Sequence, residues 1–177
     1  MNFLKNHHKY KWILSIALFS PTVLANANIT TDSLRWSGTV PKVSVSSAYE
    51  IKSANGYPAL TNGTLSINST GTSGEYAVEG STELAFNVVD NSDQSIKNNF
   101  DIRLNLLQSL INGEIVSTGP DLKLVRSTDN TEITSTATNH SEEQVNLRIE
   151  PGTANTFNAQ AGELFSVQAF IEISNVN

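Results

Sequence analysis

Few residues in this sequence could carry out chemistry, and His140 is the first to consider. The chain has three histidines, of which His7 and His8 lie near the N-terminus, and it has no cysteine. A Ser–His–acid triad would have to use His140. No G-x-S-x-G elbow presents a serine, since Gly71–Gly74 has the wrong spacing. We expect His140 to be a solvated loop residue and the protein not to be an enzyme.

Carboxylates are the other candidates, as metal ligands or as an acid–base pair. The segment Asp90–Asp93 has the character of a calcium loop, but it lacks the ligand spacing and the terminal bidentate glutamate of an EF-hand. We interpret it as a polar turn. Glu142 and Glu143 are adjacent, so on a strand their side chains would point to opposite faces. A zinc site without cysteine would need several carboxylates beside one histidine. We therefore expect no cofactor and no metal.

Residues 1–27 have the pattern of a cleaved signal peptide. Their start carries three lysines and no acidic residue, Lys5, Lys9 and Lys11. The apolar run at 12–19 is shorter than the roughly 20 residues that span a bilayer. Small residues then alternate up to Ala25 and Ala27, which is typical of a cleavage site. We expect export, with cleavage after Ala27 preferred over Ala25.

Composition limits what the exported part can do. Removing residues 1–27 from the 177 leaves 150, enough for one domain with a core. The leader holds 3 of the 11 lysines and arginines and none of the 17 acidic residues, so the remainder has a formal charge of −9. This charge argues against nucleic-acid binding, which needs a basic surface. Without cysteine, stability must come from burial and backbone pairing.

The elements that must position any site are strands. Apolar residues recur at every second position in short bursts, which indicates strands with one buried face. The clearest bursts are Leu34/Trp36/Val40, Val43/Val45, Leu65/Ile67, Leu84/Phe86/Val88, Phe100/Ile102/Leu104/Leu106, Leu122/Leu124, Val145/Leu147/Ile149 and Phe165/Val167/Ala169/Ile171/Ile173. About eight short strands predict an all-β sandwich or barrel. Residues 104–115 could also form a short helix, but Asn112-Gly113 favours a hairpin tip there.

The first burst has a pattern of its own. Leu34, Trp36, Gly38 and Val40 share one face of a strand that follows a polar start at 28–33. Leucine and tryptophan are costly to expose. Such a segment can add itself to the open edge of another sheet, where backbone hydrogen bonds give affinity and alternate side chains fill pockets. A glycine in the same phase permits close approach.

The two terminal strands together resemble those of chaperone–usher pilins. The apolar-x-aromatic-x-Gly-x-apolar pattern of that family's N-terminal extensions is matched by Leu34-x-Trp36-x-Gly38-x-Val40. The Gly-led alternating segment from Gly162 to Ile173, close to the C-terminus, is similar to the family's last strand. Many pilins have a disulfide near the first strand and a penultimate tyrosine, whereas this chain has no cysteine and has Val176 in that place. In its missing disulfide the chain resembles the alternative-chaperone or common-pilus-like branches rather than the type-1-like one.

This resemblance implies a fold and a mechanism. The fold would be an incomplete immunoglobulin-like Greek-key β-sandwich at 41–177, with a donor-strand extension at 28–40. A periplasmic chaperone would fill the open groove, and at an outer-membrane usher the extension of the next subunit would replace it, building a fimbria on the cell surface. The donor residues would be Leu34, Trp36, Gly38 and Val40, with Ile29 further out. The acceptor groove would be lined by Phe165, Val167, Ala169 and Ile171.

An alternative remains from periodicity alone. Residues 34–40 would then be the first strand of a self-complete sandwich, and the protein a stand-alone secreted binding module, lectin-like or part of a matrix. For a single pilin chain we expect the donor segment to be a loose extension or to fold back onto its own last strand. Residues 41–177 should be compact in either case.

Overall fold

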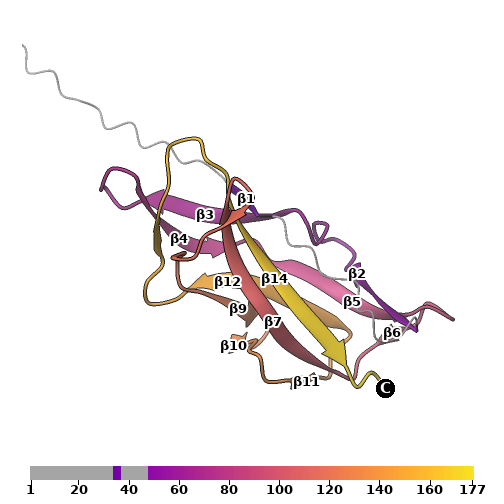
Figure 1. The fold of residues 1–177 in the computed structure, drawn as a ribbon. Helices are drawn as coiled ribbons and strands as arrows, with labels where there is room; N and C mark the ends of the chain where they lie inside the picture. The colour runs from indigo at the N-terminus through magenta and orange to yellow at the C-terminus, as the bar shows by residue number, and fades with distance from the viewer. Residues whose placement is uncertain (1–33, 37–47) are drawn as a thin grey trace, which may run out of the picture. The chain divides into compact units, whose positions relative to one another are not determined.

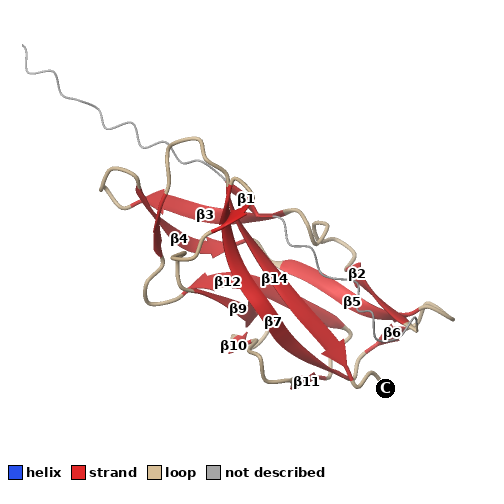
Figure 2. Ribbon diagram, viewed as in Figure 1, coloured by secondary structure: helices blue, strands red, loops and turns tan. Residues whose placement is uncertain are grey.

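A computed structural model describes residues 34–36 and 48–177 of the chain. Within these ranges the secondary structure consists of strands, turns and loops without a helix (Figure 2). Every strand pairing is antiparallel. The expected all-β class is thereby confirmed, and the short helix considered for residues 104–115 is excluded.

The strands form three sheets (Figure 1). The first sheet has the order β1 (Leu34–Trp36), β3 (Gly63–Ser69), β4 (Glu75–Ser81), β13 (Thr156–Asn158). The second has the order β10 (Thr131–Glu132), β9 (Leu122–Arg126), β12 (Gln144–Pro151), β5 (Leu84–Asp90), β2 (Tyr49–Ser53), with β6 (Ile96–Lys97) also on β5. The third has the order β11 (Thr138–His140), β7 (Phe100–Ile111), β14 (Phe165–Ser174), with β8 (Glu114–Ile115) also on β7.

One hydrophobic core joins the three sheets. Its residues alternate along the strands, which is the pattern of sheets packed face to face. They come from β3, β4 and β13 (Leu65, Ile67, Val78, Phe157), from β5, β9 and β12 (Leu84, Phe86, Val88, Leu124, Val145, Leu147, Ile149), from β7 and β14 (Phe100, Ile102, Phe165, Val167, Ile171, Ile173), and from the position after β10 (Ile133). In Figure 1 the long β7–β14 pair crosses in front of β5, β9 and β12. The architecture is therefore that of a β-sandwich.

The β7–β14 pair contains one irregularity that corrects the sequence analysis. Ile171 pairs with Leu104 and Phe170 with Leu106, so Asn105 is an extra residue in β7. An extra residue of this kind is a β-bulge, and it shifts the alternation beyond it by one position. Leu106, expected to share the face of Leu104, is consequently 48% exposed. Leu107 packs against the core in its place.

The hairpin predicted at Asn112-Gly113 is present. It joins β7 to β8, and its two residues have φ angles of +52° and +85°. Two consecutive positive φ values are typical of a type I′ turn, which asparagine and glycine tolerate best. The Asn112 backbone N–H also donates to the carbonyl of Leu164 (2.8 Å), and the Leu164 N–H donates to Asn112 Oδ1 (3.0 Å). The hairpin tip is thus fixed beside the start of β14.

Candidate functional site

The predicted acceptor residues all lie along β14, on the side that faces the core. Phe165, Val167 and Ile171 are at most 3% exposed, and Ala169 is partly buried against the same core. Phe165 stacks on Phe157 of β13, with ring centroids 4.0 Å apart. The regular alternation of β14 therefore produces one continuous apolar face. The chain fills the space in front of this face with its own core side chains.

The backbone edge of β14 is the feature that could bind another strand. Among the described residues, β14 pairs with β7 alone, over all ten positions from Phe165 to Ser174. A strand paired on one side presents a row of backbone N–H and C=O groups on the other, and this row is a template for a further strand. β14 is a strand of ten residues, and none of them is a proline. Its outer edge is therefore a suitable site for strand addition.

The N-terminal segment approaches this edge without pairing with it. β1 pairs antiparallel with β3, with Leu34 opposite Leu65 and Trp36 opposite Gly63. The same three residues lie close to β14, although no β1–β14 ladder forms within the described part of the chain. For the donor segment we expected a loose extension or a return onto β14. Residues 34–36 pair with β3 instead. Of the other predicted donor residues, Ile29, Gly38 and Val40 lie outside the described residues.

Polar side chains on the outer face of the β7–β14 pair link the two strands. Arg103 Nη2 donates to Glu172 Oε2 (2.8 Å) and Asn105 Nδ2 reaches the same oxygen (3.3 Å). Gln108 Nε2 donates to Gln168 Oε1 (2.9 Å). The Arg103 guanidinium, and next the Asn105 amide, hold the pKa of Glu172 below its usual value. These contacts join β14 to β7 and leave its opposite edge to other partners.

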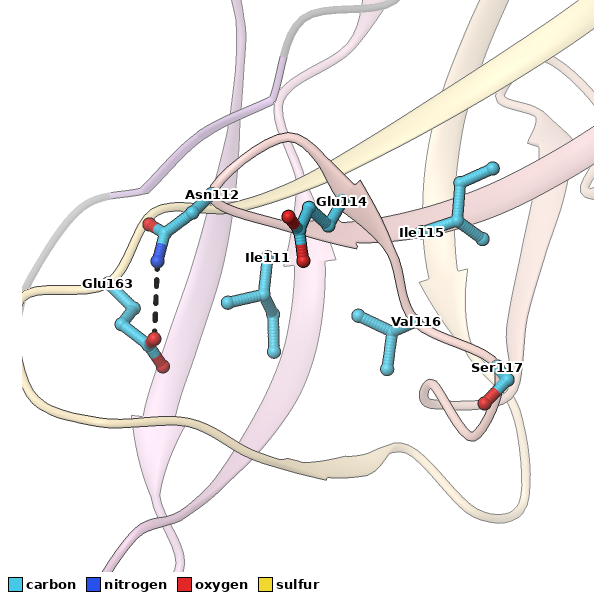
Figure 3. Close-up of a pocket in the computed structure, with 7 residues that line it drawn as sticks. All are labelled: Ile111, Asn112, Glu114, Ile115, Val116, Ser117 and Glu163. Carbon is cyan, nitrogen blue, oxygen red and sulfur yellow. Dashed lines mark hydrogen bonds between the residues drawn. The ribbon is translucent and has the colours of Figure 1, made fainter.

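A shallow hollow of about 480 Å³ lies at the hairpin tip (Figure 3). It is lined by Ile111, Asn112, Glu114, Ile115, Val116, Ser117 and Glu163. Asn112 Nδ2 donates to Glu163 Oε1 (3.1 Å) across one side, as the dashed line in Figure 3 shows. Its lining has two carboxylates and no basic side chain. The hollow would therefore attract a cation rather than an anion.

His140 is not the solvated loop residue that the sequence predicts. It is 2% exposed and lies in β11, opposite Phe100 of β7. Its ring centroid is 5.1 Å from that of Phe100. Three residues are too few for a periodic pattern, and the polar neighbours concealed this burial. In the described part of the chain, the side chain that forms a hydrogen bond with the imidazole is that of Arg126, not a serine.

The acidic segment at 90–93 is a polar turn, as expected. Asp90 Oδ1 accepts from the Ser92 N–H (2.9 Å) and hydroxyl (2.7 Å), and Asp93 Oδ1 accepts from the Ser95 N–H (2.9 Å). The bonds from Ser92 lower the pKa of Asp90, and Lys97 pairs with the same carboxylate at 3.3 Å. Across the described ranges, no cluster of three or more histidine, cysteine, aspartate or glutamate residues could hold a metal.

In residues 34–36 and 48–177 there is no helix long and apolar enough to cross a membrane. Comparison with protein-family models, with curated proteins and with solved structures finds no match.

Proposed function

We propose that this protein is a structural subunit of a surface fimbria that polymerises by donor-strand exchange. The sandwich would be of the incomplete immunoglobulin-like Greek-key type. The N-terminal extension of one copy, residues 28–40, would add to the β14 edge of the next. The observation that carries the proposal is the unpaired edge of β14. This ten-residue strand has one apolar face, and among the described residues it pairs with a neighbouring strand along one edge only.

Repetition of this contact makes a fibre. Donor segment and acceptor edge are different surfaces of the same chain, so the contact is head-to-tail and need not close into a ring. Backbone hydrogen bonds along β14 would supply affinity, and Leu34, Trp36 and Val40 would supply apolar contacts. Before assembly a periplasmic chaperone would protect the edge, and an outer-membrane usher would bring successive subunits together at the cell surface.

The experiment compares the chain that starts at Asn28 with one that lacks residues 28–40. We expect the longer chain to form oligomers that survive mild detergent and the shorter chain to remain monomeric, as measured by size-exclusion chromatography with light scattering. A synthetic peptide of residues 28–40 should bind the shorter chain and raise its melting temperature. The control peptide carries Trp36→Asp, which places a charge where an apolar residue is required, and it should not bind.

A second function is favoured by one observation, the pairing of β1 with β3 of its own chain. If residues 34–40 are simply the first strand of a self-complete sandwich, the protein is a stand-alone secreted binding module. In that case, the chain that starts at Asn28 would be monomeric at every concentration, because residues 34–36 would stay paired with its own β3, and the peptide would only replace the strand that the shorter chain lacks. That result would rule out the fimbrial proposal.

A further inference from the structure

His140 combines burial with a hydrogen bond that only its neutral form can make. It is the only histidine in the described part of the chain, and its side chain lies against the Phe100 ring. Arg126 Nη1 lies 3.3 Å from His140 Nδ1. Because a guanidinium can only donate, Nδ1 must accept and carries no proton. The proton of the neutral ring is therefore on Nε2, which is buried.

The charges around the ring oppose a second proton. Arg126, at the end of β9, is held in place by Asp129, with Nε–Oδ1 and Nη2–Oδ2 distances of 3.0 and 2.7 Å. The carboxylate of Glu142, which follows β11, and the backbone of Gln144 and Glu142 favour protonation, but burial and next the Arg126 charge outweigh them and lower the pKa of His140. On β7, Asp101 is already engaged by the Asn175 amide at 2.7 Å.

We propose that His140 is a pH-sensitive latch, whose neutral imidazole accepts the Arg126 hydrogen bond and holds β11 on the edge of β7, and whose protonation releases β11. A protonated ring cannot accept at Nδ1, so the bond would be replaced by repulsion between two confined cations. β11 has only three residues, with Thr138 opposite Ile102 and His140 opposite Phe100. So short a strand depends strongly on each anchoring contact.

The sign of the effect follows from the direction of the pKa shift. In the released strand the imidazole has its ordinary pKa, near 6.5, and in the docked strand the pKa of His140 is lower. Between these two values the released state binds more protons, so docking weakens as the pH falls through 6.5 towards the lower pKa of the docked form. Five carboxylates have pKa values below the ordinary ones and remain ionised in this pH window, so they do not contribute to the change: Glu83, Asp90, Asp93, Asp129 and Glu172. The latch is independent of the proposed assembly.

The test is amide hydrogen exchange of the full chain by NMR at about pH 7.5 and about pH 5, expressed as protection factors to remove the intrinsic pH dependence. The amides of β11, and those of β7 that face it, should lose at least about threefold in protection at the lower pH. His140→Gln retains an acceptor oxygen for Arg126 but cannot be protonated, so its protection should not change. Equal losses in the two proteins would overturn the latch.

A matched control places the imidazole elsewhere on the same strand. Asn139 is exposed and lies beside His140 in β11, so Asn139→His in the His140→Gln background adds a titrating ring without burial. This double variant should show no acid-dependent release. A loss equal to that of the wild type would mean that any histidine on β11 suffices, and the latch would be refuted.

A measurement on the wild type alone covers the case in which the variants do not fold. The His140 ring is titrated by NMR on the same samples. The latch requires the protection of β11 to fall as the pH decreases from 6.5, the ordinary value for an imidazole, to the midpoint of ring protonation, and to level off below that midpoint. A loss of protection that begins only below the ring midpoint, or that continues steadily through it, would disprove the latch.

Discussion

β7 and β14 pair along ten positions, yet they carry the same hydrophobic face in different ways. β14 alternates without interruption, so Phe165, Val167 and Ile171 all face the core. β7 changes phase at Asn105 and faces the core with Leu104 before the bulge and Leu107 after it. A sheet therefore tolerates a β-bulge in one strand if the residues that face the core are apolar both before and after the bulge. The predictions below test this contrast.

The largest loss is expected at the start of β14. Phe165→Ala removes a ring that is 1% exposed and stacked on Phe157, and should lower the free energy of unfolding by about 3–5 kcal/mol through the cavity it leaves. Urea unfolding followed by circular dichroism measures this. The neighbouring Leu164 is 49% exposed, and Leu164→Ala should cost no more than about 0.5 kcal/mol. Similar costs at both positions would mean that β14 has no distinct inner face.

The next prediction concerns β7 beyond the bulge. Leu107 packs against the core opposite Ala169. Leu107→Ala should cost about 2 kcal/mol, the lower end for leucine because the side chain is only partly buried. The same urea titration is the measurement. A negligible cost would contradict the phase change at Asn105.

A much smaller effect is expected one residue earlier. Leu106 is 48% exposed and pairs with Phe170 on the outer face. Leu106→Ser should change the free energy of unfolding by no more than about 0.5 kcal/mol. If it costs as much as Leu107→Ala, the alternation continues unbroken through Asn105, and the predicted order of the two leucines is wrong.

The smallest effect concerns the polar side of the pair and depends on pH. The Arg103 and Asn105 contacts lower the pKa of Glu172 from 4.5, so its ionised form stabilises the fold at neutral pH. This contribution is complete above pH 4.5 and is lost as the pH falls through the lower pKa of the folded state. Glu172→Gln should therefore be slightly less stable than the wild type at neutral pH and equal to it in strong acid. A difference that persists in acid would point to shape rather than charge.

Sequence patterns predicted the long strands and the hairpin because both rest on local preferences. The alternation of Phe165 to Ile173 and the turn at Asn112-Gly113 are each determined by a few neighbouring residues. The phase change at Asn105 has no such signature, because asparagine suits a strand exterior as well as a bulge. β4 was also missed, since Val78 is the only fully buried residue among its seven.

The candidate site was predictable only in part. The core side of β14 follows from its alternation, and burial of three of the four predicted acceptor residues agrees with it. The pairing of β1 with β3 depends on contacts between distant segments, which periodicity does not encode. The burial of His140 likewise depends on Phe100 and Arg126, which are 40 and 14 residues away in the chain.

The distance in sequence between β14 and its partner β7 has a consequence for folding. β7 ends at Ile111 and β14 begins at Phe165, so more than fifty residues separate the two strands. Because pairings between distant segments are slow to form, the β7–β14 ladder should be among the late contacts of folding. Truncation before Phe165 would remove four core residues at once, Phe165, Val167, Ile171 and Ile173. Such a product would expose apolar surface and stay open to proteolysis.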